Sequence, residues 1–258
     1  MSDEPLSESD ANLNILKLSV IDSTNLFAKE RFNELMDRTA VVADSQTSGR
    51  GRGGRSWYSL QGNLFLTLVL KPNIPFSKNS AHSAMTHYTG VTLCLLLEKM
   101  GLKPEIKWPN DVLIERKKIA GILAESIHMP MGRLGIVLGL GVNLNMRDSD
   151  LETIDQPAIS LTQLLPPNKR PSRDRFLRQY LNLFFEQYDL FFKKGFPMIA
   201  STYDSFLLYK GERVRLQTEH SLTFGTIKGV GPDGALYLVG DDNKLREYYV
   251  GDVWLEKA

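Results

Sequence analysis

Cysteine is almost absent from this sequence of 258 residues, which contains only Cys94. One thiol cannot form an internal disulfide, nor can it build a zinc site from several cysteines. We therefore expect a protein of a reducing, cytoplasmic compartment. Because free cysteine is among the most buried residue types, we interpret Cys94 as part of the core rather than as a nucleophile.

A net charge of one sign is also lacking, because 31 lysines and arginines stand against 30 aspartates and glutamates, for a formal charge of +1. Such a balance provides no overall field that would attract nucleic acid or anionic lipid. Apolar residues make up 42% and charged residues 24% of the chain, which excludes a disordered or fibrous protein. We expect neither DNA nor a membrane among the partners.

Long hydrophobic runs are missing as well. The apolar stretch at residues 134–144 is interrupted by glycines and is too short to span a membrane. The first ten residues contain Asp3, Glu4, Glu8 and Asp10 but no basic side chain, which excludes a signal peptide. We interpret residues 1–13 as a flexible tail.

The patterns of apolar and polar residues predict an α+β domain over residues 14–209. Strands are expected at residues 14–21, 39–44, 63–70, 105–107, 112–115, 118–127 and 133–144. Helices are expected at residues 22–36, 80–100, 172–193 and 198–208. The aromatic residues of the helix at 172–193 follow its apolar face, which is typical of a packed core.

The residue pattern changes near residue 210, from long helical and strand-like segments to short strand-like runs. Short β-branched and aromatic runs at residues 214–216, 223–230, 235–239 and 247–250 are separated by turns rich in glycine and aspartate. This pattern predicts a small all-β barrel over residues 210–258. No low-complexity linker precedes it, so we expect the two domains to pack against each other.

The loop GRGRGGRS at residues 49–56 is the strongest local motif. Gly49, Gly51 and Gly54 fit the G-x-G-x-x-G pattern of dinucleotide-binding folds, and the whole segment fits a P-loop with Arg55 in place of lysine. Both motifs need a helix directly after the glycines, since the phosphate binds at its N-terminus. The following residues 57–70 predict a turn and a strand instead, so neither motif fits its context.

Two other interpretations of this loop stay open. Arginines interleaved with glycines occur in segments that bind single-stranded nucleic acid, although such segments are usually long. A solvated basic loop is the simplest alternative. Four glycines among three arginines are costly in conformational entropy, however, which favours a loop that adapts around an anion.

Two further motifs lie downstream. The turn KWPND at residues 107–111 is followed by KIAGIL at residues 118–123. If these pieces form a hairpin, Asp111 and Lys118 come close across the sheet, either as functional groups or as an ordinary surface ion pair. The segment GLGVN at residues 139–143 permits close backbone approach and ends in Asn143, with a β-bulge as the alternative.

In this order and with this spacing, the motifs resemble those of biotin protein ligases. The motifs are DSTN at residues 22–25, Gln46 with the glycine-arginine loop, and the segments at 107–111, 118–123 and 139–143. The resemblance covers the chain from about residue 15 onward. It implies a mixed sheet flanked by helices, as in class II aminoacyl-tRNA synthetases, and an SH3-like β-barrel at the C-terminus. Because the first motif begins at Asp22, we expect no DNA-binding domain before it and no operator binding.

The resemblance also implies a reaction in two steps. Biotin and MgATP give biotinyl-5′-AMP and pyrophosphate, and the biotinyl group then passes to a lysine of a biotin carboxyl carrier protein or domain. ATP and Mg²⁺ are therefore the expected cofactors, with the metal held mainly by the ATP phosphates rather than by a protein metal site. A homodimer is possible in such a protein.

The residue roles that the resemblance implies fall into three groups. The biotin-binding residues are Ser23, Thr24, Asn25, Gln46, Arg50, Gly51, Arg52 and Lys118. The ATP-binding residues are Arg50, Arg52, Asn110, Asp111, Lys118 and Asn143. The catalytic residues are Lys118, Arg52 and Asp111. Trp57 and Trp108 are expected to brace the loops or form part of the biotin wall.

Two alternative functions are weighed against this one. Lipoate or octanoate ligation on the same fold would need a pocket for a linear acyl chain, and the arginine-glycine-histidine pattern of that family is not found here. A non-enzymatic binding module would account for residues 210–258 but not for the upstream motifs.

Overall fold

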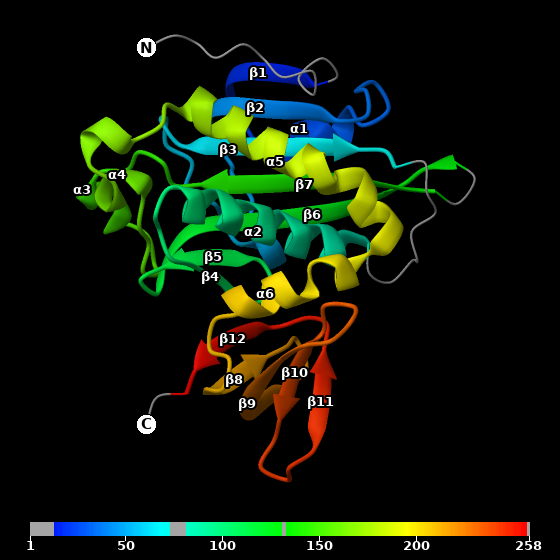
Figure 1. Cartoon of the computed structure of the whole chain (residues 1–258). Helices are drawn as coiled ribbons and strands as arrows, with labels where there is room; N and C mark the ends of the chain where they lie inside the picture. The colour runs from blue at the N-terminus through cyan, green and yellow to red at the C-terminus, as the bar shows by residue number, and fades with distance from the viewer. Residues whose placement is uncertain (1–12, 73–80, 131–132, 257–258) are drawn as a thin grey trace.

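A computed structural model describes residues 13–72, 81–130 and 133–256, and the predicted N-terminal tail lies outside them apart from residue 13. The larger unit is built on a seven-stranded sheet in the order β1-β2-β3-β7-β6-β5-β4 (Figure 1). Its strands are β1 Asn14–Ile21, β2 Thr39–Gln46, β3 Leu64–Leu70, β4 Pro104–Lys107, β5 Asp111–Ile114, β6 Lys117–His128 and β7 Leu134–Val142. Only β1 and β2 pair in parallel, so the sheet is mixed, as predicted.

Alternation along the strands separates the two faces of this sheet. On β3, Leu64, Leu66, Leu68 and Leu70 all join the main hydrophobic core, whereas Val69 belongs to a smaller cluster on the opposite face. β7 likewise sends Ile136, Leu138, Leu140 and Val142 to the main core and leaves Gly139 and Gly141, together with Val137, on the other face. The second face is therefore only partly filled by side chains.

The main core lies beneath α2 Ala81–Lys99 and α5 Arg173–Lys194, which cross the same face of the sheet (Figure 1). Tyr88 of α2 stacks on Phe191 at a centroid distance of 4.5 Å and meets Phe184 edge-on at 5.0 Å. The aromatic stripe of α5 is therefore core, as predicted. Cys94 is fully buried, and burial raises the pKa of its thiol well above the ordinary value.

The opposite face carries α1 Thr24–Glu30. Its N-cap is Ser23, whose side chain accepts a hydrogen bond from the Leu26 amide. The prediction that this helix runs to Met36 is wrong, because it ends at Glu30. Phe32 then turns inward and packs against Val41 and Val137, which takes the chain off the helical path.

Short helices complete this unit. α3 Asp148–Leu151 and α4 Leu161–Leu164 were not predicted, since a helix of four residues has too few residues to show periodicity. α6 Ala200–Phe206 occupies most of the predicted final helix. No helix in the described part of the chain is long and apolar enough to cross a membrane.

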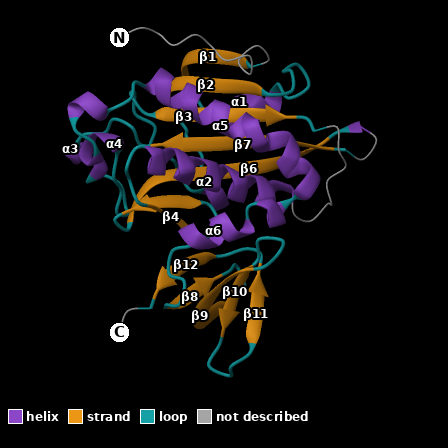
Figure 2. Cartoon of the chain, viewed as in Figure 1, coloured by secondary structure: helices purple, strands orange, loops and turns teal. Residues whose placement is uncertain are grey.

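In its described part, residues 210–256, the C-terminal module consists of strands and loops (Figure 2). Its strands are β8 Arg213–Gln217, β9 Leu222–Val230, β10 Leu236–Val239, β11 Leu245–Tyr248 and β12 Asp252–Leu255, in the antiparallel order β11-β10-β9-β8-β12. The strand β12 was not predicted. Val214, Leu216 and Val253 of this module belong to the same hydrophobic cluster as the main core, so the two units pack into one body.

Candidate active site

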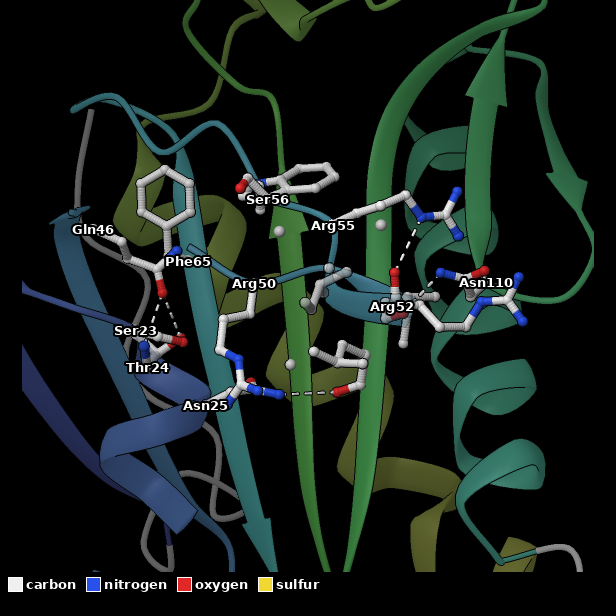
Figure 3. A pocket seen from close by; sticks show the side chains of 18 of the residues that line it. Ser23, Thr24, Asn25, Gln46, Arg50, Arg52, Arg55, Ser56, Phe65 and Asn110 are labelled. Carbon is white, nitrogen blue, oxygen red and sulfur yellow. Dashed lines mark hydrogen bonds between the residues drawn. The ribbon is translucent and has the colours of Figure 1, made fainter. Parts of the chain in front are cut away.

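The motifs converge on the second face of the large sheet, where β6 and β7 carry glycines. A pocket there is bounded by the start of α1, the end of β2, the glycine-arginine loop, and β5, β6 and β7 (Figure 3). Its cavity volume is about 90 Å³. The lining includes every residue predicted to bind biotin, although those residues come from segments nearly 100 positions apart. The topology of the sheet brings them together.

Neutral polar side chains form one wall of the pocket. Gln46 Oε1 accepts hydrogen bonds from the Thr24 amide at 2.8 Å and from the Thr24 hydroxyl at 3.1 Å. The buried Thr67 hydroxyl bridges Thr24 Oγ1 at 2.8 Å and Asn25 Oδ1 at 2.7 Å. Asn25 Nδ2 donates to the Leu123 carbonyl at 3.2 Å. This network fixes uncharged donors and acceptors before any ligand arrives.

The glycine-arginine loop folds into a tight turn above the sheet. The Gly51 amide donates to the Arg55 carbonyl at 2.6 Å, and Arg52–Gly54 form one turn of 3₁₀ helix. Gly53 and Gly54 have φ angles of 63° and 76°, a left-handed conformation that favours glycine. The glycine spacing therefore serves the turn itself, and no helix begins in the described residues 55–72 that follow it.

Trp57, directly after this turn, lies flat on the glycines of the sheet. A Cβ atom added to Gly141 would lie 2.5 Å from Trp57 Cε2, and one added to Gly121 would lie 2.7 Å from Cζ3. The Lys118 Nζ atom sits 5.2 Å from the centre of the indole. The two glycines thus leave the space that Trp57 occupies between the loop and the sheet.

Lys118 and Asp111 meet across the hairpin of β5 and β6, as the spacing predicted. Lys118 Nζ lies 2.8 Å from Asp111 Oδ1, and both side chains are only 15% exposed. The contact is ionic rather than an aligned hydrogen bond, because that oxygen has no donor in hydrogen-bond geometry within the described residues. Asn110 beside it donates from Nδ2 to the Ile122 carbonyl at 3.1 Å.

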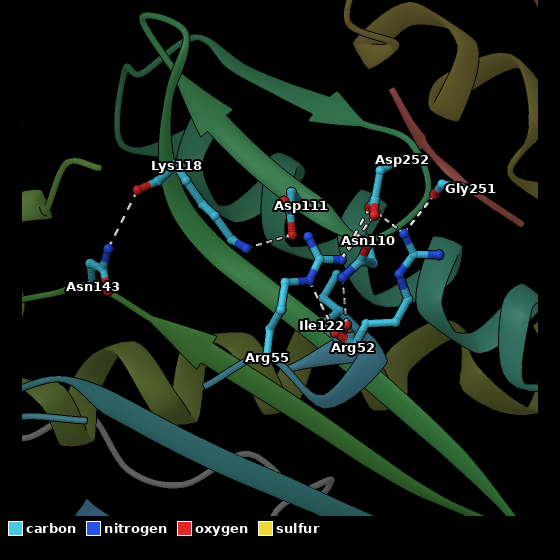
Figure 4. A network of polar contacts seen from close by, with 9 residues as sticks. All are labelled: Arg52, Arg55, Asn110, Asp111, Lys118, Ile122, Asn143, Gly251 and Asp252. Atoms are coloured by element: carbon cyan, nitrogen blue, oxygen red, sulfur yellow. Dashed lines mark hydrogen bonds and ion pairs between the residues drawn. The ribbon is translucent and has the colours of Figure 1, made fainter. Parts of the chain in front are cut away.

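Further cations surround this pair. Arg50 is exposed and points into the pocket near Asn25 (Figure 3). Burial lowers the pKa of Lys107 below its ordinary value, and the nearby Asp111 and Asp252 offset part of that effect. Arg52 and Arg55 also line the pocket, and both bind Asp252 of the C-terminal module (Figure 4). No local pattern indicates this contact, which joins residues about two hundred positions apart.

A second cavity of about 430 Å³ adjoins the first and shares Gln46, Ser56, Trp57, Lys118 and Gln156 with it. Its far side is the irregular segment at residues 153–158. Asn143 also lines this cavity, and its Nδ2 donates to the carbonyls of Lys118 at 3.4 Å and Ile159 at 3.2 Å. Asn143 therefore holds that segment against β6.

The structure thus brings all the predicted site residues to one region and adds others. Asn143 lies at the second cavity, while the other predicted residues line the first. Gln156, Arg55 and Asp252 were missed, because no motif surrounds Gln156 or Asp252 and Arg55 was considered only as a P-loop substitute. Within the described residues, no three histidine, cysteine, aspartate or glutamate side chains are grouped to hold a metal ion.

Chemically, the region combines a neutral, hydrogen-bonding wall with a group of four cations, Arg50, Arg52, Arg55 and Lys118. A cation group of this kind can bring two anions together and stabilise charge on a phosphoryl group. The larger adjoining cavity lies on the far side of Trp57 and Lys118, so a second ligand can meet the first at Lys118.

Comparisons with known proteins agree with this arrangement. Residues 18–143 match the model of the biotin/lipoate A/B protein ligase family, and residues 210–255 match that of the biotin protein ligase C-terminal domain. The bifunctional ligase/repressor BirA of Bacillus spizizenii is 32% identical over 92% of this chain and 72% of its own length. The biotin–[acetyl-CoA-carboxylase] ligase of Paracoccus denitrificans is 31% identical over 86% of this chain and 93% of its own length.

Solved structures extend the similarity to the fold. The biotin protein ligase from Aquifex aeolicus in complex with biotin and ATP has a TM-score of 0.80 at 29% identity, over 95% of this chain and 99% of that chain. Both the catalytic sheet and the C-terminal module lie within that coverage. From its motifs, its pocket and these relatives, the chain belongs to the biotin protein ligase family.

Proposed function

We propose that this chain is an ATP-dependent biotin–[acetyl-CoA-carboxylase] ligase. It converts biotin and ATP to biotinyl-5′-AMP and pyrophosphate, and then transfers the biotinyl group to a lysine of a biotin carboxyl carrier protein or domain. The observation that carries the proposal is the junction of the two cavities at Lys118, with the neutral wall on one side and the cations at the rim.

Biotin fits the first cavity by its chemistry. Its bicyclic ring is uncharged and carries a ureido group, which needs neutral donors and acceptors in an otherwise apolar site. Ser23, Thr24, Asn25 and Gln46 supply those groups, and Trp57 supplies an apolar face.

In the first step, the biotin carboxylate attacks the α-phosphate of ATP, and pyrophosphate leaves. Two anions approach each other, so the reaction needs positive charge at the point of contact. Lys118 lies where the cavities meet and serves both reacting groups, while Arg50, Gly51 and Arg52 close over the carboxylate. A closed loop also keeps water from the mixed anhydride.

The second cavity takes the nucleotide in this proposal. Trp57 and the segment at residues 153–158 bound it, and Asn143 holds that segment in place. Asn110 and Asp111 face the phosphates. One carboxylate and one amide suit Mg²⁺, which usually binds through one or two carboxylates together with substrate phosphates; when bound, the ion would neutralise phosphate charge.

In the second step, the amine of the acceptor lysine attacks the biotinyl carbonyl and AMP leaves. That amine has an ordinary pKa of about 10.4, so it must be deprotonated as it reacts. In this proposal Asp111 orients the amine, which is supported by the position of its carboxylate at the same junction as Lys118. The physiological acceptor is a carrier domain of a carboxylase, and the reaction takes place in the cytoplasm.

We also propose the division into a catalytic domain at residues 14–209 and a C-terminal domain at residues 210–258. The proposed activity is ligation, and we propose no DNA binding.

The test of the proposed function is pyrophosphate release from MgATP by the purified protein, with biotin or with lipoate. Release that depends on biotin supports the proposal, whereas release with lipoate alone, or with neither acid, contradicts it.

A further inference from the structure

An aspartate of the C-terminal module contacts the glycine-arginine loop. Asp252 opens β12, an edge strand of its sheet. Arg52 Nη2 binds Asp252 Oδ1 and also donates to the Gly251 carbonyl at 2.6 Å. Arg55 Nη2 lies 3.1 Å and 3.3 Å from the two Asp252 oxygens (Figure 4). One carboxylate therefore holds two guanidinium groups of the loop.

Charge balance makes this contact more than a surface ion pair. The pocket gathers Arg50, Arg52, Arg55 and Lys118, and Asp111 is already paired with Lys118. The side chains of Arg52 and Asp252 are only 28% and 33% exposed. Burial alone would raise the pKa of Asp252, but Arg52 and Arg55 outweigh it and hold that pKa below its ordinary value. Asp252 thus stays ionised and serves as the counter-ion of the loop.

The position of Asp252 is set by a second contact on the same face of β12. Two residues further along the strand, the Trp254 ring contacts two cations, Lys107 Nζ at 5.3 Å and the Arg215 guanidinium at 5.0 Å from the ring centre. Lys107 belongs to β4 of the large sheet, so its contact with Trp254 ties β12 to the catalytic unit. Because β12 is tied to the large sheet in this way, Asp252 can restrict the movement of the glycine-arginine loop.

Arg52 keeps one donor without a partner in the described residues. Its Nε atom is buried and has no hydrogen-bond partner within the described residues, while its Nη2 atom is bound by the module. We infer that Asp252 is a positioning residue of the ligase: it holds Arg52 and Arg55 in the closed loop, where the Arg52 N–H group without a partner can meet the anionic intermediate.

This inference rests on the proposed function and gives it a specific consequence. Neutralising Asp252 should weaken closure of the loop and let biotinyl-5′-AMP escape before transfer. Because the ion pair is about one-third exposed, we expect Asp252→Asn to raise the released fraction of intermediate about three- to tenfold. The KM for ATP should rise, while the rate of adenylate formation at saturating ATP should change less.

The test measures biotinyl-5′-AMP released into solution per molecule of pyrophosphate formed, in the full-length protein. Asp242→Asn is the matched control. It removes the same charge from the same module, but Asp242 pairs with Arg246 in a solvent-exposed ion pair. Asp252→Glu, which keeps the charge, should restore part of the retention. In an Arg52→Gln background, Asp252→Asn should add less than it does in the wild type, since only its contact with Arg55 remains to be lost.

Arg55→Gln tests the same contact from the loop, where the side chain is 56% exposed and its loss should not disturb folding. The Arg55→Gln variant should also release more biotinyl-5′-AMP per pyrophosphate than the Asp242→Asn control. The inference is overturned if neither Asp252→Asn nor Arg55→Gln leaks more than the control, or if the effects of Asp252→Asn and Arg52→Gln add. A wild-type protein that forms no pyrophosphate with biotin would instead refute the proposed function.

Discussion

Lys118 is the residue on which the chemistry depends most. Its ammonium group lies at the junction of the two cavities, 2.8 Å from Asp111. Lys118→Ala removes a charge that matters more to the phosphoryl transition state than to the neutral biotin rings. We expect adenylate formation to fall about 10²- to 10³-fold, with biotin binding still measurable by calorimetry.

The control for that variant is Lys117→Ala. Lys117 is the exposed neighbour of Lys118 on the same strand, so its loss should leave pyrophosphate release near the wild-type rate. Near-normal turnover of Lys118→Ala would remove this lysine from the mechanism.

For Arg52 we expect a loss of retention of the intermediate rather than a loss of adenylate formation. Arg52→Gly removes the contacts to Asp252 and Gly251 and adds a flexible glycine to the loop. One charge-assisted hydrogen bond contributes about 1.5–3 kcal/mol, so the intermediate should still form at Lys118 and Arg50 but escape more often. Released biotinyl-5′-AMP acylates any amine, so serum albumin in the reaction should become biotinylated. Unlabelled albumin, with pyrophosphate release intact, would show that Arg52 does not retain the intermediate.

At the scale of elements, β6 and β7 shape the site through their glycines, which place no side chain on the face that carries the pocket. Gly141 leaves room for Trp57, and a Cβ there would lie 2.5 to 2.9 Å from the indole. Gly141→Ala should push Trp57 and the loop off the sheet, since overpacking of this kind costs about 1–3 kcal/mol. We expect kcat/KM for biotin to fall by about tenfold or more.

Gly90→Ala in α2 provides the comparison, because its Cβ would meet ordinary contacts of 3.5 Å and longer, to Ile106 and Ile122. That variant should retain full activity. Equal kinetics of Gly90→Ala and Gly141→Ala would contradict the role assigned to Trp57 and the sheet glycines.

The sequence predicted elements well where local pattern decides them. The hairpin of β5 and β6 was expected from its alternation and turn, and with it the meeting of Asp111 and Lys118. The end of α1 at Glu30 was not expected. The helical pattern continues to Met36, but the tertiary packing of Phe32 overrides it. Asp252 was missed for a related reason: its partners are set by docking of the C-terminal module, and no local signal marks it.

At the scale of the whole molecule, the C-terminal module is structurally continuous with the catalytic unit. Trp108 is buried and its Nε1 donates to the Gly234 carbonyl at 3.1 Å, while β12 holds the loop through Asp252. A chain ending at Tyr209 should therefore lose ligation and unfold at a lower temperature. The neutral wall at Thr24, Asn25 and Gln46 lies within that shorter chain, so biotin binding should persist. Thermal unfolding, calorimetry and carrier labelling check these outcomes, and normal ligation by the short chain would contradict them.

The central claim is that this protein activates biotin and attaches it to a carrier. The most direct measurement is the intact mass of a purified biotin carboxyl carrier domain after incubation with the protein, MgATP and an equal mixture of biotin and lipoate. The account predicts the mass increase of one biotinyl group on a single lysine, absent when ATP or Lys118 is removed. An unmodified carrier, or a carrier that gains a lipoyl group instead, would contradict it.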